Sequence, residues 1–230
     1  MTGETCTAVA AAARRLAEAG LLVGTAGNVA ARVPGTDLVC VTATGVRLAG
    51  CGPEDVTVVT PEGAVVEGSL APTSELDLHL SVLAGSDAGA VVHTHAPFAT
   101  AVACVLDELP VLHYQQLLLG GAIPVAPYAT FGTPELAASV TRALAGRSAA
   151  LMANHGSVVV GADLEAAVEN ALLLEWLCAL HHRASALGDP RVLDDHQQAD
   201  VVRVAIERSY GTSRPLAGQQ SPADHTVEDQ

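Results

Sequence analysis

Apolar residues recur along the chain at two spacings, one typical of helices and one typical of strands. Blocks with apolar side chains three or four residues apart, and long runs rich in alanine and leucine, are predicted to be helices. These predicted helices are Thr7–Ala19, Ser74–Ala84, Ala96–Leu106, Glu135–Gly146, Asp163–Leu187 and His196–Arg208. In the second of them, Ser74 is followed three residues later by Asp77, which predicts a capping box at the helix N-terminus.

Short valine-rich runs between turn residues predict the strands. Such runs lie within residues 24–33, 38–45, 55–60, 61–68 and 88–95, and residues 148–161 predict two more strands around a tight Asn154-His155-Gly156 turn. Residues 109–121 mix both patterns, and their periodicity does not decide between helix and strand. The mixture of helices and strands, without a repeat or a linker, predicts an α/β fold.

Composition and charge narrow the possible partners. The chain has 230 residues, half of them hydrophobic, which is enough to bury a substantial core. No apolar run approaches the roughly 20 residues needed to span a bilayer, and charged residues interrupt the longest candidate, Leu164–Leu187. The net charge of −14 argues against nucleic acid and anionic membranes as partners, because both require clustered cations.

Cysteine usage and the two ends of the chain predict a compartment and a domain boundary. The five cysteines are scattered and never form a CxxC pair, so we expect free thiols in a reducing cytoplasm. The first residues lack the basic segment and apolar core of a secretory signal, and none is expected. Residues 1–211 are predicted to form one domain. Residues 212–230 are polar with little to bury, so we expect them to be disordered.

The sequence contains no lysine. Catalysis through a Schiff base on a side-chain amine, an internal pyridoxal phosphate linkage and a phosphate-binding lysine of the Walker type are therefore all excluded. Carbonyl chemistry in this protein would need another electrophile, and a metal ion is the obvious substitute.

Three histidines provide a candidate metal site. His93 and His95 stand two residues apart on a predicted strand, so their side chains share one face. A zinc-like site needs a third protein ligand, and a catalytic site also keeps an open position. His155 is the candidate third ligand, because a turn at the end of a sheet can present an imidazole. A hydrogen-bonded core residue is the alternative interpretation for any one histidine alone.

Glu75 is the carboxylate nearest to this pattern, in the first turn of the helix that precedes the histidine strand. It could serve the metal site, or it could simply be a favourable charge at a helix N-terminus. His79 follows one turn later on the same face of the helix. We interpret His79 as a core residue or a neighbour of the metal ligands rather than as a ligand.

Two turns rich in glycine and hydroxyl groups, Gly24–Asn28 and Thr42–Gly45, are ordinary turns when considered singly. Together with Thr73 and Ser74 at a helix start, they could hold a phosphate with backbone N–H groups and hydroxyls. This would be a phosphate site without a lysine.

The chain resembles the class II aldolase/adducin family in the order and spacing of eight segments: GTAGNVAARV, VTATGV, PTSELDLHL, AVVHTHAPFATAV, HY, PYATFGT, NHG and RSYG. The resemblance extends from about Ala8 to Gly211. It implies a single three-layer α/β domain whose central, largely antiparallel β-sheet is flanked by helices. It also implies a cytoplasmic zinc-dependent lyase that splits a ketose 1-phosphate, either L-fuculose 1-phosphate or a related 5-deoxyketose 1-phosphate, into dihydroxyacetone phosphate and an aldehyde.

The resemblance also implies roles for individual residues. The Zn2+ ligands would be His93, His95 and His155, with Glu75 both as a fourth ligand in the empty site and as the acid/base. The residues that hold the phosphate would be Gly27, Asn28, Thr44, Gly45, Thr73 and Ser74, and Thr73 stands where the family usually has a serine. Tyr114 would be a catalytic residue contributed by a neighbouring subunit of a homotetramer, with Tyr210 closing near the substrate and Phe131 in the aldehyde pocket.

Two alternatives remain open at this point. Sugar-phosphate epimerases, dehydratases and decarboxylases of the same superfamily use a similar three-histidine zinc site, but the epimerases usually have an aspartate where this chain has Glu75. An adducin-like interaction module would keep the fold without the metal. The intact set of His93, His95 and His155 argues against such a module.

Overall fold

The computed structural model describes residues 1–208, 210 and 211, and the predicted disorder of residues 212–230 concerns a segment outside them. The chain divides into two compact units, Met1–Leu193 and Asp194–Gln230. The described part of the second unit contains the helix α6 (Asp195–Arg208), which matches its prediction within one residue. That residues 1–211 act as one domain stays a prediction.

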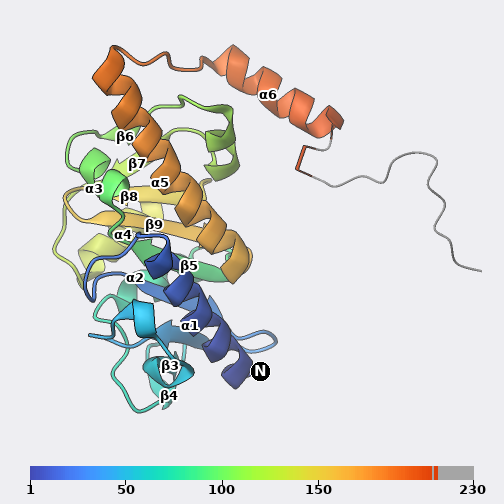
Figure 1. Cartoon of the computed structure of the whole chain (residues 1–230). Coiled ribbons are helices and arrows are strands. Elements are labelled where there is room, and N and C mark those ends of the chain that lie inside the picture. The colour runs from blue at the N-terminus through green and yellow to red at the C-terminus, as the bar shows by residue number, and fades with distance from the viewer. Residues whose placement is uncertain (209, 212–230) are drawn as a thin grey trace, which may run out of the picture. The chain divides into compact units, whose positions relative to one another are not determined.

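A nine-stranded sheet forms the middle layer of the first unit (Figure 1). Its strands are β1 (Asn28–Arg32), β2 (Val39–Thr42), β3 (Val56–Val59), β4 (Val65–Glu67), β5 (Ala90–Thr94), β6 (Glu108–Leu109), β7 (Ile123–Ala126), β8 (Ala149–Met152) and β9 (Gly156–Gly161). Their order in the sheet is β4-β3-β2-β1-β5-β9-β8-β7-β6. All neighbouring pairs are antiparallel except β7 and β8, so the predicted largely antiparallel sheet is confirmed.

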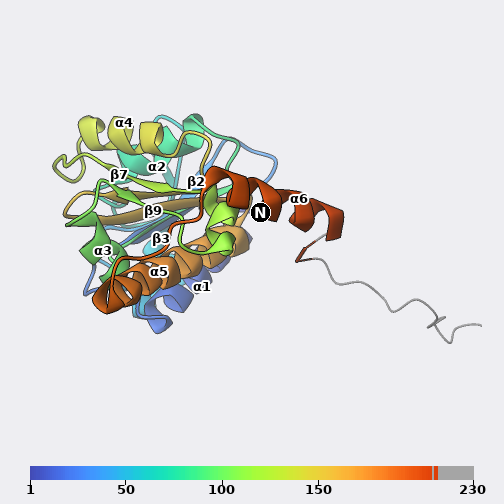
Figure 2. The ribbon, with the colours of Figure 1, turned by 90° about the horizontal axis from the view of Figure 1, so that it is seen from above.

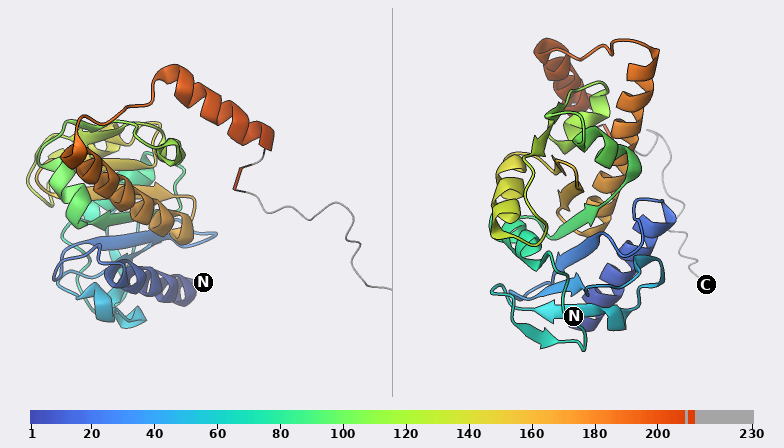
Figure 3. Two further views of the ribbon diagram at one scale, coloured as in Figure 1. Left: turned by 45° about the horizontal axis from the view of Figure 1, so that its top comes forward. Right: turned by 90° about the vertical axis from the view of Figure 1, so that its left-hand side faces the viewer.

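Helices cover both faces of this sheet. The α-helices of the first unit are α1 (Thr2–Glu18), α2 (Leu76–Ala84), α3 (Pro97–Ala103), α4 (Pro134–Ala143) and α5 (Leu164–Leu187). Three short 3-10 helices join them, η1 (Leu48–Gly50), η2 (Pro53–Asp55) and η3 (Tyr114–Leu119). Helices α2 and α4 lie on one face, and α1, α3 and α5 lie on the other, which gives the predicted three layers (Figures 2 and 3).

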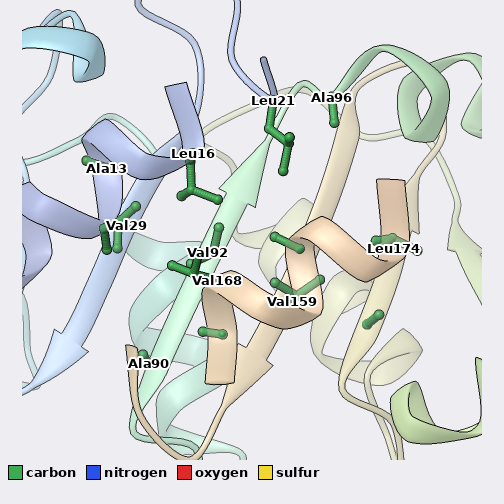
Figure 4. Packing of buried hydrophobic residues seen from close by; sticks show 14 of the residues in the cluster. Ala13, Leu16, Leu21, Val29, Ala90, Val92, Ala96, Val159, Val168 and Leu174 are labelled. Atoms are coloured by element: carbon green, nitrogen blue, oxygen red, sulfur yellow. The ribbon is translucent and has the colours of Figure 1, made fainter. Parts of the chain in front are cut away.

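Alternation along the strands supplies two hydrophobic cores, because successive side chains of a strand point to opposite faces. In β5, Val92 faces α1 and α5, whereas Val91 faces α2 and α4. Figure 4 shows the first core, in which Val29 and Val92 pack with Leu16 of α1 and Val168 of α5. The central strands are covered on both faces and are therefore almost wholly apolar, so a polar residue within them stands out.

Two predicted helix starts were wrong. Helix α1 begins at Thr2 rather than Thr7, because Thr5, Cys6 and Val9 are buried and their packing extends the helix toward the N-terminus. Helix α2 begins at Leu76, and no side chain caps it, so the capping box of Ser74 and Asp77 is absent. The hydroxyl of Thr73 instead accepts the backbone N–H of Glu75 at 3.2 Å, and this turn leaves Glu75 at the N-cap position.

None of the helices in residues 1–208 combines the length and the apolar character that crossing a bilayer requires. All five cysteines fall within these residues, and each is a free thiol, as predicted.

Candidate functional site

The candidate site lies where β1, β5 and the β8–β9 turn meet the start of α2. His93 lies near the end of β5, and Asn28 at the start of β1 is its direct partner across the sheet. His95 follows β5, and His155 lies in the turn between β8 and β9. Glu75, at the N-cap of α2, comes from the helical layer on the same face of the sheet. Four separate segments therefore contribute to one site.

The turn that carries His155 has a backbone conformation that only certain residues can adopt. Asn154 has φ 56°, in the left-handed region that asparagine tolerates better than most residues. At Gly156, an added Cβ would lie 2.3 Å from the carbonyl oxygen of Thr94, so only glycine allows β9 to pass this close to β5. The Asn-His-Gly sequence thus supplies the turn that places His155 beside His93 and His95.

The three imidazoles and the carboxylate converge closely. One ligand nitrogen from each histidine lies within 4.8 Å of the other two. The Nε2 atoms of His93 and His95 are 3.0 Å apart. The Oε2 atom of Glu75 is 3.1 Å from Nε2 of His93, and its Oε1 atom is 3.5 Å from Nε2 of His155. Among the described residues, this histidine set is the one group with metal-binding geometry.

Hydrogen bonding shows that these groups suit a cation. The Nδ1–H of His93 donates to the carbonyl oxygen of Ser157 at 2.9 Å, so the Nε2 atom of a neutral His93 carries a lone pair. That lone pair faces both the carboxylate of Glu75 and the Nε2 atom of His95. The buried Oε1 atom of Glu75 also has no hydrogen-bond partner. A divalent cation among them would satisfy all of these lone pairs, so the donor set fits a metal of the zinc type.

Glu75 is buried, with 6% of its surface exposed. Burial by itself raises the pKa of this carboxyl. The close contact with the His93 ring and the hydrogen bond from the side-chain amide of Asn28, together with the nearby His155, outweigh burial and hold the pKa well below its usual range. The Asn28 amide donates to Oε2 of Glu75 at 3.0 Å.

Two of the three histidines, His95 and His155, have lowered pKa values. Burial, assisted by the charge of neighbouring imidazoles, lowers the pKa of His95 to about 4. Burial and His93 likewise lower the pKa of His155. Neutral imidazole is the form that binds metal, so His95 and His155 are ready for a metal at neutral pH.

A pocket of about 460 Å³ opens beside these ligands. Its lining includes ten of the residues singled out from the sequence: Gly27, Asn28, Thr44, Gly45, Thr73, Ser74, Glu75, His95, Phe131 and His155. Gly27 has φ 92°, and an added Cβ would lie 3.0 Å from the carbonyl oxygen of His93. A residue with a side chain at position 27 would therefore clash with β5, and glycine allows the turn to lie this close to the strand. Phe131 lies at the pocket with 64% of its surface exposed.

Three of the predicted site residues, His93, Tyr114 and Tyr210, are not among the residues that line this pocket. His93 belongs to the metal-binding set beside it. Tyr114 begins η3, and its ring lies 4.5 Å from that of His113. Tyr210 belongs to the second unit, and its place near the substrate stays a prediction.

Sequence reasoning missed Tyr128 and Asn154, which also line the pocket. It also missed Glu175, which accepts backbone N–H groups at the start of α3. Only Asn154 had a local signal, because asparagine is typical of left-handed turn positions and Asn154 stands in a predicted tight turn.

Residues 7–182 match the family described as Class II Aldolase and Adducin N-terminal domain. The chain belongs to this family. Members of the class II aldolase and adducin family therefore provide the comparison for its site, and the family predicted from the sequence is confirmed.

Relatives with named activities are similar over most of their length. A 5-methylthioribulose-1-phosphate/5-deoxyribulose-1-phosphate aldolase of Rhodospirillum rubrum is 37% identical over 209 residues, which are 89% of this chain and 91% of the relative. An L-fuculose phosphate aldolase of Escherichia coli strain K12 is 39% identical over 186 residues, 80% of this chain and 85% of the relative. A solved L-fuculose 1-phosphate aldolase superposes with a TM-score of 0.81 at 32% identity, over 85% of this chain and 93% of that one.

Proposed function

We propose that this chain is a zinc-dependent aldolase that cleaves a ketose 1-phosphate into dihydroxyacetone phosphate and an aldehyde. The observation that carries the proposal is the convergence of His93, His95 and His155 on the buried Glu75 beside an open pocket. The chain is an aldolase-type lyase by its family and by the names of its relatives. Those names make 5-deoxyribulose 1-phosphate, 5-methylthioribulose 1-phosphate and L-fuculose 1-phosphate the first substrates to test.

The metal would be held by the three histidines, with Glu75 as a further ligand before substrate binds. When bound, zinc supplies a Lewis acid that polarises the substrate carbonyl, which a chain without lysine cannot do by forming a Schiff base. The chain's own contribution begins with orientation. The Nδ1–H bond from His93 to Ser157 fixes the ring so that Nε2 points at the site.

The phosphate of the substrate would bind at the polar end of the pocket. That end offers the hydroxyls of Thr44, Thr73 and Ser74 and the amide of Asn28. Backbone N–H groups at Gly27 and Gly45 add donors in turns where a phosphate can approach closely. None of the described residues that line the pocket is a lysine or an arginine, so neutral donors would hold the dianion.

Glu75 and Tyr114 would move the two protons of the reaction. Tyr114, as its phenolate, takes the proton of the hydroxyl on C4, and the bond between C3 and C4 breaks to release the aldehyde. Glu75, displaced from the histidines by the substrate, is buried without their stabilising contacts, so its pKa rises and it carries a proton. It delivers this proton to C3, which completes dihydroxyacetone phosphate, and the proton held by Tyr114 replaces it for the next turnover. The buried position of Glu75 keeps bulk water away from this transfer.

Tyr114 would come from a neighbouring subunit of a homotetramer. Within one chain, Tyr114 is absent from the pocket lining, and 40% of its surface is exposed. It extends an aromatic patch, which we define as His113, Tyr114 and Trp176, where the rings of His113 and Trp176 lie 4.9 Å apart. A second copy of the chain is the partner that this patch would meet.

We place the enzyme in the cytoplasm, where its five free thiols would stay reduced.

The deciding experiment is a screen of ketose 1-phosphates for release of dihydroxyacetone phosphate. Activity should appear with one of the three named substrates, disappear with a chelator and return with zinc, and borohydride should trap no covalent adduct. An isomeric sugar phosphate without dihydroxyacetone phosphate would instead identify an epimerase. Full activity in metal-free protein would refute the proposal.

A further inference from the structure

His79 is fully buried on α2, one turn after Glu75. Its Nε2 atom hydrogen bonds to Oδ1 of Asn28. The amide nitrogen of Asn28 in turn donates to Oε2 of Glu75 at 3.0 Å. Asn28 and Glu75 are buried as well, with 5% and 6% of their surfaces exposed. A continuous polar chain, which we call the His79–Asn28–Glu75 relay, therefore ends at the carboxylate of the site.

The chemistry of the three groups sets the direction of every bond in the relay. An ionised carboxylate only accepts, so the NH2 group of Asn28 must face Glu75. The Oδ1 atom of Asn28 then faces His79 and also only accepts, so His79 must donate through Nε2–H. The Nδ1 atom of His79 is buried without a hydrogen-bond partner. The imidazole is therefore a neutral donor in one defined tautomer.

We propose that His79 is a positioning residue for Glu75 that acts through Asn28. Without the donor of His79, the Asn28 amide can turn over and present its oxygen to the carboxylate, which repels Glu75 from its place beside the histidines. His79 itself is neither one of the residues that line the pocket nor a member of the metal-binding set. The proposal rests on the proposed function for the role of Glu75, but the hydrogen-bonded relay itself does not.

A double-mutant cycle tests the relay through turnover. His79→Leu should lower kcat by about 10- to 100-fold, the usual cost of losing a hydrogen bond that orients a ligand. KM should rise by less than kcat falls, because Asn28 is only one of several groups that would hold the phosphate. His79→Gln should restore kcat to within a few-fold, because its amide N–H can reach the position of Nε2–H. In an Asn28→Ala background, His79→Leu should cause no further loss.

Val82→Ala is the matched control for destabilisation alone. Val82 is also buried on α2 but makes no polar contact of this kind, so its truncation should lower the melting temperature and leave kcat unchanged. Additive losses in the cycle would overturn the proposal. A loss of kcat in Val82→Ala as large as that in His79→Leu would do the same.

Two readouts on metal-free protein do not depend on any reaction. Nitrogen-15 NMR at neutral pH should find His79 as the neutral Nε2–H tautomer, and Asn28→Ala should remove that preference. Zinc affinity, measured by competition with a chelating dye, should fall in His79→Leu and recover in His79→Gln. An Nδ1–H tautomer in the wild type would refute the relay even if no substrate had been found. If His79→Leu does not fold, the tautomer of His79 in the wild-type spectrum and the zinc affinity of His79→Gln still test the relay.

Discussion

The carboxylate of Glu175 accepts the backbone N–H of Phe98 at 2.9 Å, and its second oxygen accepts that of Ala99 at 2.8 Å. Through these bonds α5 caps the first turn of α3, which begins two residues after His95. No side chain within α3 or at its N-cap does this. A carboxylate in a different helix therefore caps the helix that begins just after His95.

We expect Glu175→Gln to lower the free energy of unfolding by about 1–2 kcal/mol in urea titrations. A glutamine offers one acceptor to two N–H groups and turns its own amide toward the second of them. Glu169→Gln is the control on the same helix, because Glu169 is exposed and pairs with Arg15, where an ion pair contributes at most about 1 kcal/mol. Equal losses in both variants would show that the cap has no particular importance.

Metal binding should require His155. In His155→Ala, we expect zinc affinity to fall by at least about 100-fold, the upper end of the cost of losing a ligand's hydrogen-bond partner. Zinc should raise the melting temperature of the wild type and not that of this variant, because only the native state would bind the ion. His196→Ala is the control, since His196 is an exposed residue of α6. Unchanged zinc content in His155→Ala would contradict the three-histidine site.

Turnover should depend on the carboxylate of Glu75 more than on any other charge of α2. Glu75→Gln should reduce kcat by roughly 100- to 10,000-fold, as expected when a positioned general acid is lost, while the phosphate contacts keep KM nearly unchanged. Asp77→Asn makes the same chemical change two residues later at an exposed position and should have little effect. Near-normal turnover in Glu75→Gln would assign the proton transfer to another group.

The metal-free protein should lose stability as the pH falls from 6.5 toward 4. Histidine titrates near 6.5 when unfolded, whereas burial lowers the pKa of His95 to about 4 and that of His79 to about 3. Between these values the unfolded chain binds protons that the folded chain does not. The stabilisation is therefore complete above pH 6.5 and is lost as the pH falls through the folded pKa.

Each such histidine contributes a slope of at most about 1.4 kcal/mol per pH unit to the free energy of unfolding. His95→Asn should give a shallower slope than the wild type in denaturant titrations across this range. His196→Asn, at an exposed position, should leave the slope unchanged. The same slope in all three proteins would mean that His95 is not a depressed titrating group.

A shared active site can be tested by mixing inactive variants. Glu75→Gln and Tyr114→Phe oligomers should each be nearly inactive. After joint unfolding and reassembly in equal amounts, about a quarter of the sites should regain both groups, because each group is present with even odds in a cyclic ring. If both residues acted within one chain, mixing would restore nothing even where mixed oligomers are shown to form.

The sequence by itself determined the family, the type of most elements and the metal-binding pattern, but periodicity did not decide residues 109–121, where η3 lies. The spacing of His93 and His95 predicts that both side chains face the same way, although β5 ends at Thr94 and His95 follows it. The Asn-His-Gly turn marks His155, and both signals are local properties of strands and turns. The absence of lysine also needed no structure to exclude Schiff-base chemistry. Periodicity also predicted where the helices lie. The start of α1 at Thr2 differs from the prediction because of packing, and the start of α2 at Leu76 differs because of a local turn.

Only the tertiary structure decided how Glu75 is held. Its partner Asn28 is 47 residues away in sequence, and Asn28 meets His79 across 51 residues. Glu175 reaches the start of α3 across 76 and 77 residues. Periodicity reports neighbours within a turn or along a strand, so it carries no information on such contacts. They arise because the sheet and its two helical layers bring distant polar groups into one buried volume, where each must find a partner.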